Sequence, residues 1–173
     1  MKRPEEESQF IGNRTDNGMH EIVNSFLKKV QNGNPGEIPV KFHHVGIVVE
    51  SIKESAARYS QFFGLQPVSP VVIDERQGVN VQFLASEADA TCVELIEPLP
   101  GKSPARGALE KGGGLNHLCF EVADIAGFVR HAESEGVVCV CLPVPAAAFG
   151  GRRIAFLYYR EIGLIEFLEA AKK

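Results

Sequence analysis

Short apolar and β-branched runs, each interrupted by a single polar residue, recur along this chain. Two of the runs carry a histidine, His44 and His117, at equivalent positions. Runs of this kind are typical of β-strands, in which alternate side chains point to opposite faces of a sheet. Two further strand-like runs carry an acid, Glu94 and Glu166, and the offset between these acids is almost the same as that between the histidines. Because the polar interruptions repeat together with the apolar pattern, the sequence predicts an internal duplication.

The same order of elements is predicted in both halves of the repeat. Each half begins with a histidine-bearing strand, continues with an amphipathic helix that ends at a glycine, and finishes with three strands. The predicted helices are residues 52–63, ending at Gly64, and 125–135, ending at Gly136. The later strands are predicted at 66–73, 79–85 and 91–97, and again at 137–142, 153–159 and 164–169. This order predicts an α+β fold in which two β-α-β-β-β modules, residues 42–99 and 115–169, form a cupped mixed sheet around a metal site.

Residues 1–40 lie outside the repeat and are interpreted as an N-terminal extension of a domain spanning residues 41–173. Apolar residues recur at helical spacing between Asp16, the expected N-cap, and Gly33. They are Met19, Ile22, Val23, Phe26, Leu27 and Val30. This amphipathic helix is expected either to dock on the main body, to cover an exposed face or to join a dimer interface.

Strand alternation predicts that the polar interruptions share one side of the sheet. The bulky apolar neighbours are expected to face the helices, which leaves the histidines and glutamates, with Gly46, to line a concavity. A carboxylate removed from water costs several kcal/mol unless it is paired or bound to a metal. The sequence therefore predicts a divalent metal site formed by His44, Glu94, His117 and Glu166. This ligand set suits Co, Zn, Ni, Mn or Fe rather than Ca, and open coordination positions favour catalysis over a structural role.

The remaining histidines and the cysteines are not assigned to the metal site. His43 is expected to face the helix side or the strand edge. Cys139 and Cys141 belong to one predicted strand at alternate positions and are expected to share a face. None of the cysteines shows C-x-x-C spacing, and their apolar neighbours predict reduced, buried thiols. The four cysteines are Cys92, Cys119, Cys139 and Cys141.

Composition narrows the class of function. The chain has 173 residues, 45% hydrophobic and 23% charged, which is typical of a soluble globular domain. Its formal net charge is −4 without a basic stripe, which argues against a nucleic-acid partner. No apolar run reaches the roughly 18 residues that span a bilayer, and no hydrophobic segment follows the charged N-terminus as in a secretory signal. We therefore predict no membrane association and a cytoplasmic location.

These motifs resemble the vicinal-oxygen-chelate superfamily, which includes glyoxalase I, extradiol dioxygenases, antibiotic-resistance proteins and methylmalonyl-CoA epimerase. The resemblance covers about residues 42–169. It is closest to the methylmalonyl-CoA epimerases, and it implies a glyoxalase-like domain whose metal positions are His44, Glu94, His117 and Glu166. The segments that carry it are HVGIVV (44–49), QGV (77–79), ELIEPL (94–99), GLNHLCFEV (114–122) and GGRRIAFL (150–157).

The chain departs from the epimerase pattern at three places. Asn116 stands where the epimerases usually have a histidine before the metal ligand. The segment 158–163 replaces a His-Pro and glycine-rich stretch, in a loop that is expected beside the metal. Asn80 and Gln82 stand where the second acid/base carboxylate of the family is expected. The nearest acids are Asp74 and Glu75. These departures leave a changed substrate open.

The resemblance implies a metal-dependent epimerase that acts through an enolate on an acyl-CoA thioester. Glu166 is the expected acid/base on one side, with either Glu94 or a water held by Gln82 on the other. Basic residues that would meet the CoA phosphates, or else form solvated surface, are Lys102, Arg152 and Arg153. The alternatives are a glyoxalase I-like lyase acting on a hemithioacetal, an Fe(II) dioxygenase, and a non-catalytic small-molecule-binding protein. A homodimer is expected.

Overall fold

The computed structural model describes residues 40–86 and 92–172 of the chain. The helix predicted between Asp16 and Gly33 lies outside the described residues. The elements of the first module are β1 (Val40–Val48), α2 (Ile52–Phe63), β2 (Gln66–Pro67), β3 (Val72–Asp74), β4 (Val79–Ala85) and β5 (Cys92–Pro98). A short helix, α3 (Arg106–Glu110), precedes the second module. That module contains β6 (Gly114–Val122), α4 (Ile125–Ser134), β7 (Val138–Pro145), the 3-10 turn η1 (Ala147–Phe149), β8 (Arg153–Tyr159) and β9 (Gly163–Glu169).

The strand predicted over residues 66–73 is interrupted, forming β2 and β3 instead. Pro70 has no backbone N–H to donate to the ladder, so continuous pairing with β4 is broken there. At the break, the Ser69 hydroxyl accepts a hydrogen bond from the backbone N–H of Phe83 at 2.9 Å, in place of a main-chain partner. Pairing resumes at Val72, which lies opposite Val81. The first module therefore has one strand more than the pattern predicts.

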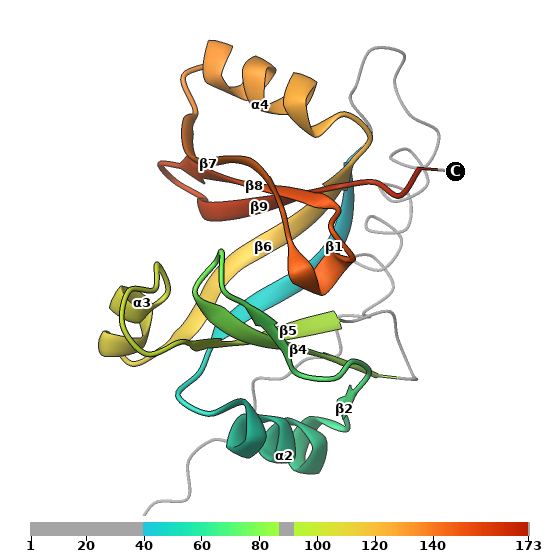
Figure 1. Ribbon diagram of the computed structural model, residues 1–173, viewed down its shortest axis with the longest axis vertical. Coiled ribbons are helices and arrows are strands. Elements are labelled where there is room, and N and C mark those ends of the chain that lie inside the picture. Colours follow the sequence, from blue (N-terminus) through green and yellow to red (C-terminus); the bar gives the residue numbers. More distant parts are fainter. Residues whose placement is uncertain (1–39, 87–91, 173) are drawn as a thin grey trace, which may run out of the picture. The chain divides into compact units, whose positions relative to one another are not determined.

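One mixed sheet runs through both modules. Its strand order is β2-β4-β5-β1-β6-β9-β8-β7, and β3 also pairs with β4. Within the modules, β1 is parallel to β5 and β6 is parallel to β9, whereas β1 and β6 join the modules in antiparallel fashion. Figure 1 shows α2 and α4 at opposite ends of this domain, with β1 and β6 between the two sets of strands.

The register between β1 and β6 relates the modules by an approximate two-fold rotation. His44 lies opposite Cys119, and Gly46 lies opposite His117. In the repeat, His44 corresponds to His117 and Gly46 corresponds to Cys119. Exchanging the two modules therefore turns each of these pairs into the other. The pairing of β1 with β6 therefore places the two histidine-bearing segments side by side in the sheet.

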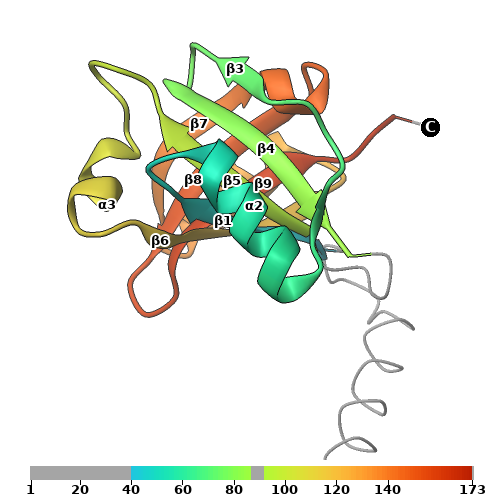
Figure 2. The same ribbon diagram turned by 90° about the horizontal axis from the view of Figure 1, so that it is seen from below.

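Each long helix begins at a side-chain cap and packs on the outer face of its own module. The Ser51 hydroxyl accepts a hydrogen bond from the N–H of Glu54, and the Asp124 carboxylate accepts one from the N–H of Gly127. Gly64 ends α2 in the left-handed conformation, with φ of 70°, as the sequence predicts. Figure 2 shows α2 lying over β4 and β5. None of the helices in the described part of the chain has the length and apolarity needed to cross a membrane.

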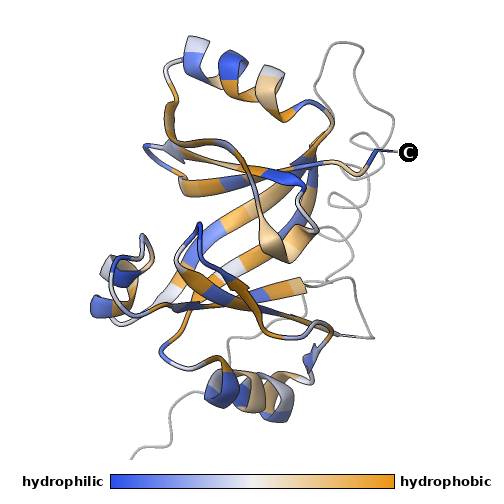
Figure 3. Cartoon of the chain, viewed as in Figure 1, coloured by the Kyte–Doolittle hydropathy of each residue, from blue (hydrophilic) through white to orange (hydrophobic). Residues whose placement is uncertain are grey.

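Figure 3 shows that hydrophobic residues predominate along the strands, and their side chains form clusters on both faces of the sheet. On the outer faces, α2 and α4 each cover one large cluster. The cluster under α2 contains Ile52, Ala56, Leu65, Leu84, Val93 and Leu95, and that under α4 contains Val122, Ile125, Val129, Ala132, Ala155, Leu157, Ile165 and Phe167. Two smaller clusters on the inner side do not involve these helices. The inner side is where the histidine and glutamate side chains meet.

Candidate metal centre and pocket

The structure brings the four predicted ligands together from β1, β5, β6 and β9. The Nε2 atoms of His44 and His117 are 3.2 Å apart. Glu94 Oε2 lies 3.3 Å from His44 Nε2 and 3.5 Å from His117 Nε2. Glu166 Oε2 lies 3.3 Å and 3.4 Å from the same two atoms. All four residues are buried, with exposed fractions of 5% or less.

This donor set fits a divalent ion of the first transition series. Donor atoms held about 2.0–2.2 Å from one ion at neighbouring coordination positions lie roughly 3–3.5 Å apart, as these do. Glu166 Oε2 is buried without a hydrogen-bond partner among the described residues, although both imidazoles lie within ion-pair distance. A buried carboxylate oxygen left in this way is a costly feature that an ion would satisfy.

The carboxylates and imidazoles of the cluster shift each other's protonation. Burial on its own lowers the pKa of His117, but the neighbouring Glu166 and Glu94 outweigh it and raise that pKa to about 9. The pKa of His44 is also raised by these two carboxylates against the effect of burial. Burial favours a higher pKa for Glu166, yet His117 and His44 lower it below its usual value. Glu166 therefore remains ionised in spite of its burial, which is the state in which a carboxylate binds a metal ion.

The residue before each candidate histidine ligand contacts its second ring nitrogen. His43 Nδ1 lies 2.9 Å from His44 Nδ1, and Asn116 Oδ1 lies 3.0 Å from His117 Nδ1. Metal-binding histidines generally donate their remaining N–H to such a partner, which fixes the ring and leaves Nε2 for the ion. Burial, followed by the charges of His44 and Arg152, lowers the pKa of His43, so a neutral ring is available as an acceptor.

The prediction that His43 faces the helix side or the strand edge is wrong. The β1–β6 register shifts between Phe42 and His44, so His43 is the extra residue of a β-bulge. The bulge turns its ring toward His44 and the ring of Phe149, whose centroid is 5.6 Å away. One sequence signal pointed to this role, because His43 and Asn116 directly precede the two ligands and so occupy equivalent positions of the repeat.

Each histidine ligand also packs edge-on against a phenylalanine at an equivalent position. The ring centroids of His44 and Phe83 are 5.3 Å apart, and those of His117 and Phe156 are 5.4 Å apart. The space for the second imidazole depends on Gly46. A Cβ atom at Gly46 would lie 2.3–2.7 Å from the ring atoms of His117, which is closer than real contacts allow. The two phenylalanines therefore hold the imidazole rings in place, and Gly46 leaves the room that the ring of His117 needs.

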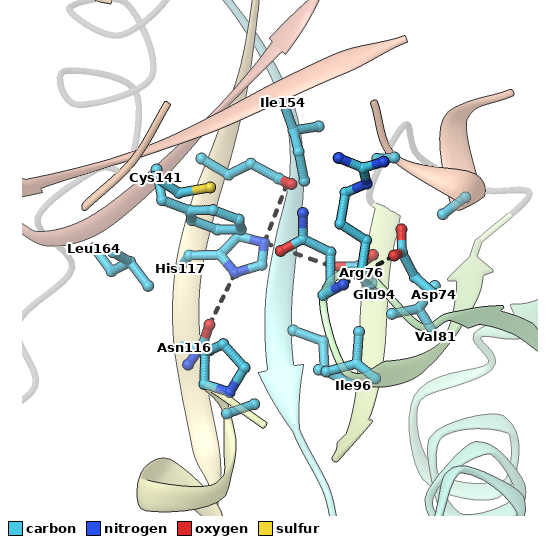
Figure 4. Close-up of a pocket in the computed structure, with 18 of the residues that line it drawn as sticks. Asp74, Arg76, Val81, Glu94, Ile96, Asn116, His117, Cys141, Ile154 and Leu164 are labelled. Carbon is cyan, nitrogen blue, oxygen red and sulfur yellow. Dashed lines mark hydrogen bonds and ion pairs between the residues drawn. The ribbon is translucent and has the colours of Figure 1, made fainter. Parts of the chain in front are cut away.

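A cavity of about 330 Å³ adjoins the cluster. His117, Glu94 and Glu166 line it, whereas His44 does not. The ring of Phe149 covers His44 at a centroid distance of 6.0 Å and an interplanar angle of 26°. Figure 4 shows His117 and Glu94 in this pocket, with apolar residues such as Ile96, Ile154 and Val81 around them. The candidate ion site is therefore closed on the His44 side and accessible on the His117 side.

Asn80 and Gln82, which stand where the family's second acid/base carboxylate is expected, do not line the pocket. Both side chains lie on the other face of β4, where Asn80 Nδ2 donates to Glu97 and Gln82 Nε2 donates to the carbonyl of Ser69 at 3.1 Å. The intervening Val79 and Val81 line the pocket instead. A water held by Gln82 is therefore removed as a candidate acid/base.

Asp74 is a pocket residue that the sequence indicated only as a nearby acid. It is buried, with Oδ1 3.0 Å from the N–H of Gln77 and Oδ2 2.9 Å from the N–H of Ala147. The first contact closes the turn after β3, and the second links that turn to η1 in the other module. With both oxygens held by backbone donors, Asp74 joins the two modules at the pocket.

Two other expectations about this region are wrong. Residues 158–163 do not line the pocket, and only the next residue, Leu164, does so.

Cys139 and Cys141 do not share a face, because the β7–β8 register shifts between them. Cys139 lies opposite Leu157 and joins the α4 cluster, whereas Cys141 lines the pocket. The cysteines are free as predicted, but Cys119 alone is fully buried. Burial, with the charge of Glu166, raises the pKa of the Cys119 thiol, which therefore stays protonated.

Two of the basic residues considered for CoA phosphates are engaged elsewhere. Arg152 Nη1 lies 2.9 Å from Glu121 Oε2, and its guanidinium carbon is 5.6 Å from the centroid of the Phe149 ring. Arg153 is paired with Glu169. Neither lines the pocket. Both therefore serve as ion-pair partners within the second module.

The fold and its two-module site belong to a known class. The family model of the Glyoxalase/Bleomycin resistance protein/Dioxygenase superfamily matches residues 43–156, and the chain belongs to this superfamily. Together with the mixed sheet of the described residues, this match confirms the predicted α+β fold class, and the N-terminal helical extension stays a prediction.

Within that superfamily, the chain is similar to methylmalonyl-CoA epimerases. It is 33% identical over 132 residues to the mitochondrial methylmalonyl-CoA epimerase of Dictyostelium discoideum, which covers 75% of this chain and 77% of that protein. It is 32% identical over 124 residues to the ethylmalonyl-CoA/methylmalonyl-CoA epimerase of Cereibacter sphaeroides, covering 70% of this chain and 90% of that protein. The crystal structure of methylmalonyl-CoA epimerase from Mycobacterium tuberculosis superposes with a TM-score of 0.70 at 26% identity, over 82% of this chain and 95% of that one.

Proposed function

We propose that this protein is a metal-dependent epimerase that acts through an enolate on a methylmalonyl-CoA-like acyl-CoA thioester. The observation that carries the proposal is a buried cluster of two histidines and two glutamates that opens on one side into a pocket of about 330 Å³. A cluster with an accessible side is typical of catalytic rather than structural metal sites. The similarity to methylmalonyl-CoA epimerases over about three quarters of the chain supports the choice of isomerase and of substrate class.

The proposed ligands of the ion are His44, Glu94, His117 and Glu166. A divalent ion of the Co, Zn, Ni, Mn or Fe group bound there would supply Lewis-acid stabilisation of the negative charge that develops on the substrate oxygens. The chain itself fixes the direction from which substrate arrives, because Phe149 covers His44 and leaves the His117 side accessible. Apolar walls beside the cluster limit water around the acidic carbon and strengthen electrostatic interactions.

Inversion at a carbon requires proton transfer on both of its faces. We assign one face to Glu166, which removes the α-proton, and the other to Glu94, which donates a proton that it has taken up from solvent. After turnover, Glu166 releases the abstracted proton to solvent and Glu94 takes up another, both through the accessible pocket. The two carboxylates come from β9 and β5, and so from different modules, and both line the pocket. The roles exchange when the opposite enantiomer is bound.

The test is incubation of metal-loaded protein with (2R)-methylmalonyl-CoA in deuterated water. We expect deuterium at C2 and formation of the 2S isomer, with Glu166→Gln reducing both rates. His131→Ala, a change on the exposed side of α4, is the matched control and should leave them unchanged. Absence of exchange with each of Co, Zn, Ni, Mn and Fe would contradict the proposal. Turnover of the methylglyoxal–glutathione hemithioacetal instead would support the glyoxalase I-like alternative. The homodimer and the cytoplasmic location stay predictions.

A further inference from the structure

Two turns that occupy corresponding places in the modules meet at the pocket. One turn, residues 75–78, joins β3 to β4, and the other, residues 147–151, joins β7 to β8. They are held together by the hydrogen bond from the N–H of Ala147 to Asp74 Oδ2. Both turns contribute side chains to the pocket wall. The approximate two-fold relation of the modules therefore extends from the ligands to the turns beside them.

The two turns differ in the large side chain that each presents. The second-module turn carries Phe149, which stacks over His44 and closes that side of the cluster. The first-module turn carries Arg76, which lines the pocket together with His117. Figure 4 shows the Arg76 side chain running along this pocket, which Glu94 also lines. Arg76 and Phe149 occupy equivalent positions of the repeat. The chain therefore has a guanidinium on the accessible side and an aromatic ring at the equivalent position on the closed side.

The Arg76 guanidinium has no hydrogen-bond or ion-pair partner among the described residues, although carboxylates line the same pocket. Three carboxylates line the pocket, those of Glu94, Glu166 and Asp74, and Arg76 is the one lysine or arginine among its described lining residues. The Asp74 oxygens are held by backbone N–H groups, and no hydrogen bond or ion pair joins Arg76 to another described residue. A planar guanidinium can form two parallel hydrogen bonds with a carboxylate. Arg76 is exposed and free to meet a ligand, so an anion entering among three carboxylates would find a counter-charge here.

We propose that Arg76 is the residue that binds the substrate's own carboxylate, and thereby selects thioesters that carry one next to the reacting carbon. This inference rests on the proposed function for the identity of the thioester. It adds a specificity-determining residue and limits the substrate class to α-carboxylated thioesters. The same guanidinium could otherwise meet a phosphate of the CoA tail, and the experiment distinguishes these two anions.

The test compares malonyl-CoA with acetyl-CoA, which differ by a single carboxylate. Equilibrium binding of each is measured by titration calorimetry on metal-loaded wild-type protein and on Arg76→Gln, Arg76→Lys and Arg58→Gln. Arg58 is an exposed arginine on α2, away from the pocket, and serves as the matched control. We expect Arg76→Gln to weaken malonyl-CoA binding by roughly 10- to 100-fold, as for loss of a charge-assisted hydrogen bond, without changing acetyl-CoA binding. Arg76→Lys should restore part of the loss.

Three outcomes would overturn the inference. The wild-type protein could show no preference for malonyl-CoA, Arg76→Gln could leave that preference intact, or it could weaken both thioesters equally, which would assign Arg76 to the CoA phosphates. Thermal unfolding of each variant checks that the fold is retained. Because binding is measured without turnover, a selective loss in a protein that does not epimerise methylmalonyl-CoA would keep Arg76 as the carboxylate site and reject the epimerase. Conversely, epimerisation of methylmalonyl-CoA together with unchanged selectivity in Arg76→Gln would keep the epimerase and reject Arg76 as the carboxylate site.

Discussion

The two modules make the same contribution to the candidate ion site but not to its surroundings. Each supplies one histidine, one glutamate and one phenylalanine packed edge-on to the histidine. The first-module histidine, His44, is fully buried under Phe149, whereas the second-module histidine, His117, lines the pocket with Arg76. A duplicated fold thus provides a nearly symmetric set of donors, and the unequal turns beside it open one side.

The largest expected effect comes from removing either of the proposed histidine ligands. If the donors are equivalent, His44→Ala and His117→Ala should each lower metal affinity by more than about 100-fold, beyond the loss typical of a supporting residue. Each should also lower the free energy of unfolding by about 3–5 kcal/mol, because buried carboxylates lose a partner. Metal analysis after dialysis and denaturant unfolding measure these effects, with His131→Ala as the control. Retention of metal by one of the two variants would show that the modules do not share the ion equally.

A second difference between the modules is the residue opposite each histidine, Cys119 for His44 and Gly46 for His117. Gly46→Ala should displace the His117 ring, lowering the free energy of unfolding by about 1–3 kcal/mol through overpacking and lowering metal affinity as well. Cys119→Ala removes one buried atom and should cost about 1 kcal/mol with metal affinity retained. Both are measured by denaturant unfolding and metal titration. Equal effects on metal affinity would mean that the glycine is not needed for the ring.

Much of this architecture could be predicted from the sequence, because it depends on periodicity and on the constant offset of the repeat. The bounds of α2, β4 and β8 agree with the pattern, and the four ligands meet as the alternation of strand residues requires. The failures occur where the register shifts along a strand. Bulges at His43 and between Cys139 and Cys141 reverse the expected faces, and alternation alone does not reveal them.

The prediction about Asn80 and Gln82 was wrong for a different reason. The expectation that they stand near the metal came from the family pattern rather than from alternation along β4. In the structure, β4 turns Val79 and Val81 to the pocket. The partnership of Asp74 with Ala147 joins residues from different modules, and such contacts depend on tertiary packing that no local pattern encodes.

His43 and Asn116 precede the two proposed histidine ligands and differ chemically. Variants of both show whether a histidine and an asparagine support the neighbouring imidazole equally well. His43→Ala and Asn116→Ala should each lower metal affinity by about 10- to 100-fold, because each ligand loses the partner of its Nδ1 atom. Asn116→Asp keeps an acceptor oxygen and should retain most of the affinity, which separates a hydrogen-bonding role from a packing role. Metal titration monitored by Co(II) absorption provides the measurement. No change in either alanine variant would remove the supporting role from these residues.

The smallest effect is expected at the helix caps, where the modules use different residues at equivalent positions. Ser51 caps α2 and Asp124 caps α4, with acceptor distances of 3.3 Å and 3.0 Å to the capped N–H groups. Alanine at either position should lower the free energy of unfolding by about 1 kcal/mol. The Asp124 change should be larger by about 0.3–1 kcal/mol, because a carboxylate also interacts favourably with the positive end of the helix dipole. Since the caps are in separate modules, the double variant should show the sum of the two losses within about 0.5 kcal/mol, as denaturant unfolding can measure. Metal affinity should not change in any of these variants, because both caps lie on the outer faces. A loss of metal in Ser51→Ala alone would show that the first module, although it is the more closed one, is coupled to its helix more tightly than the second.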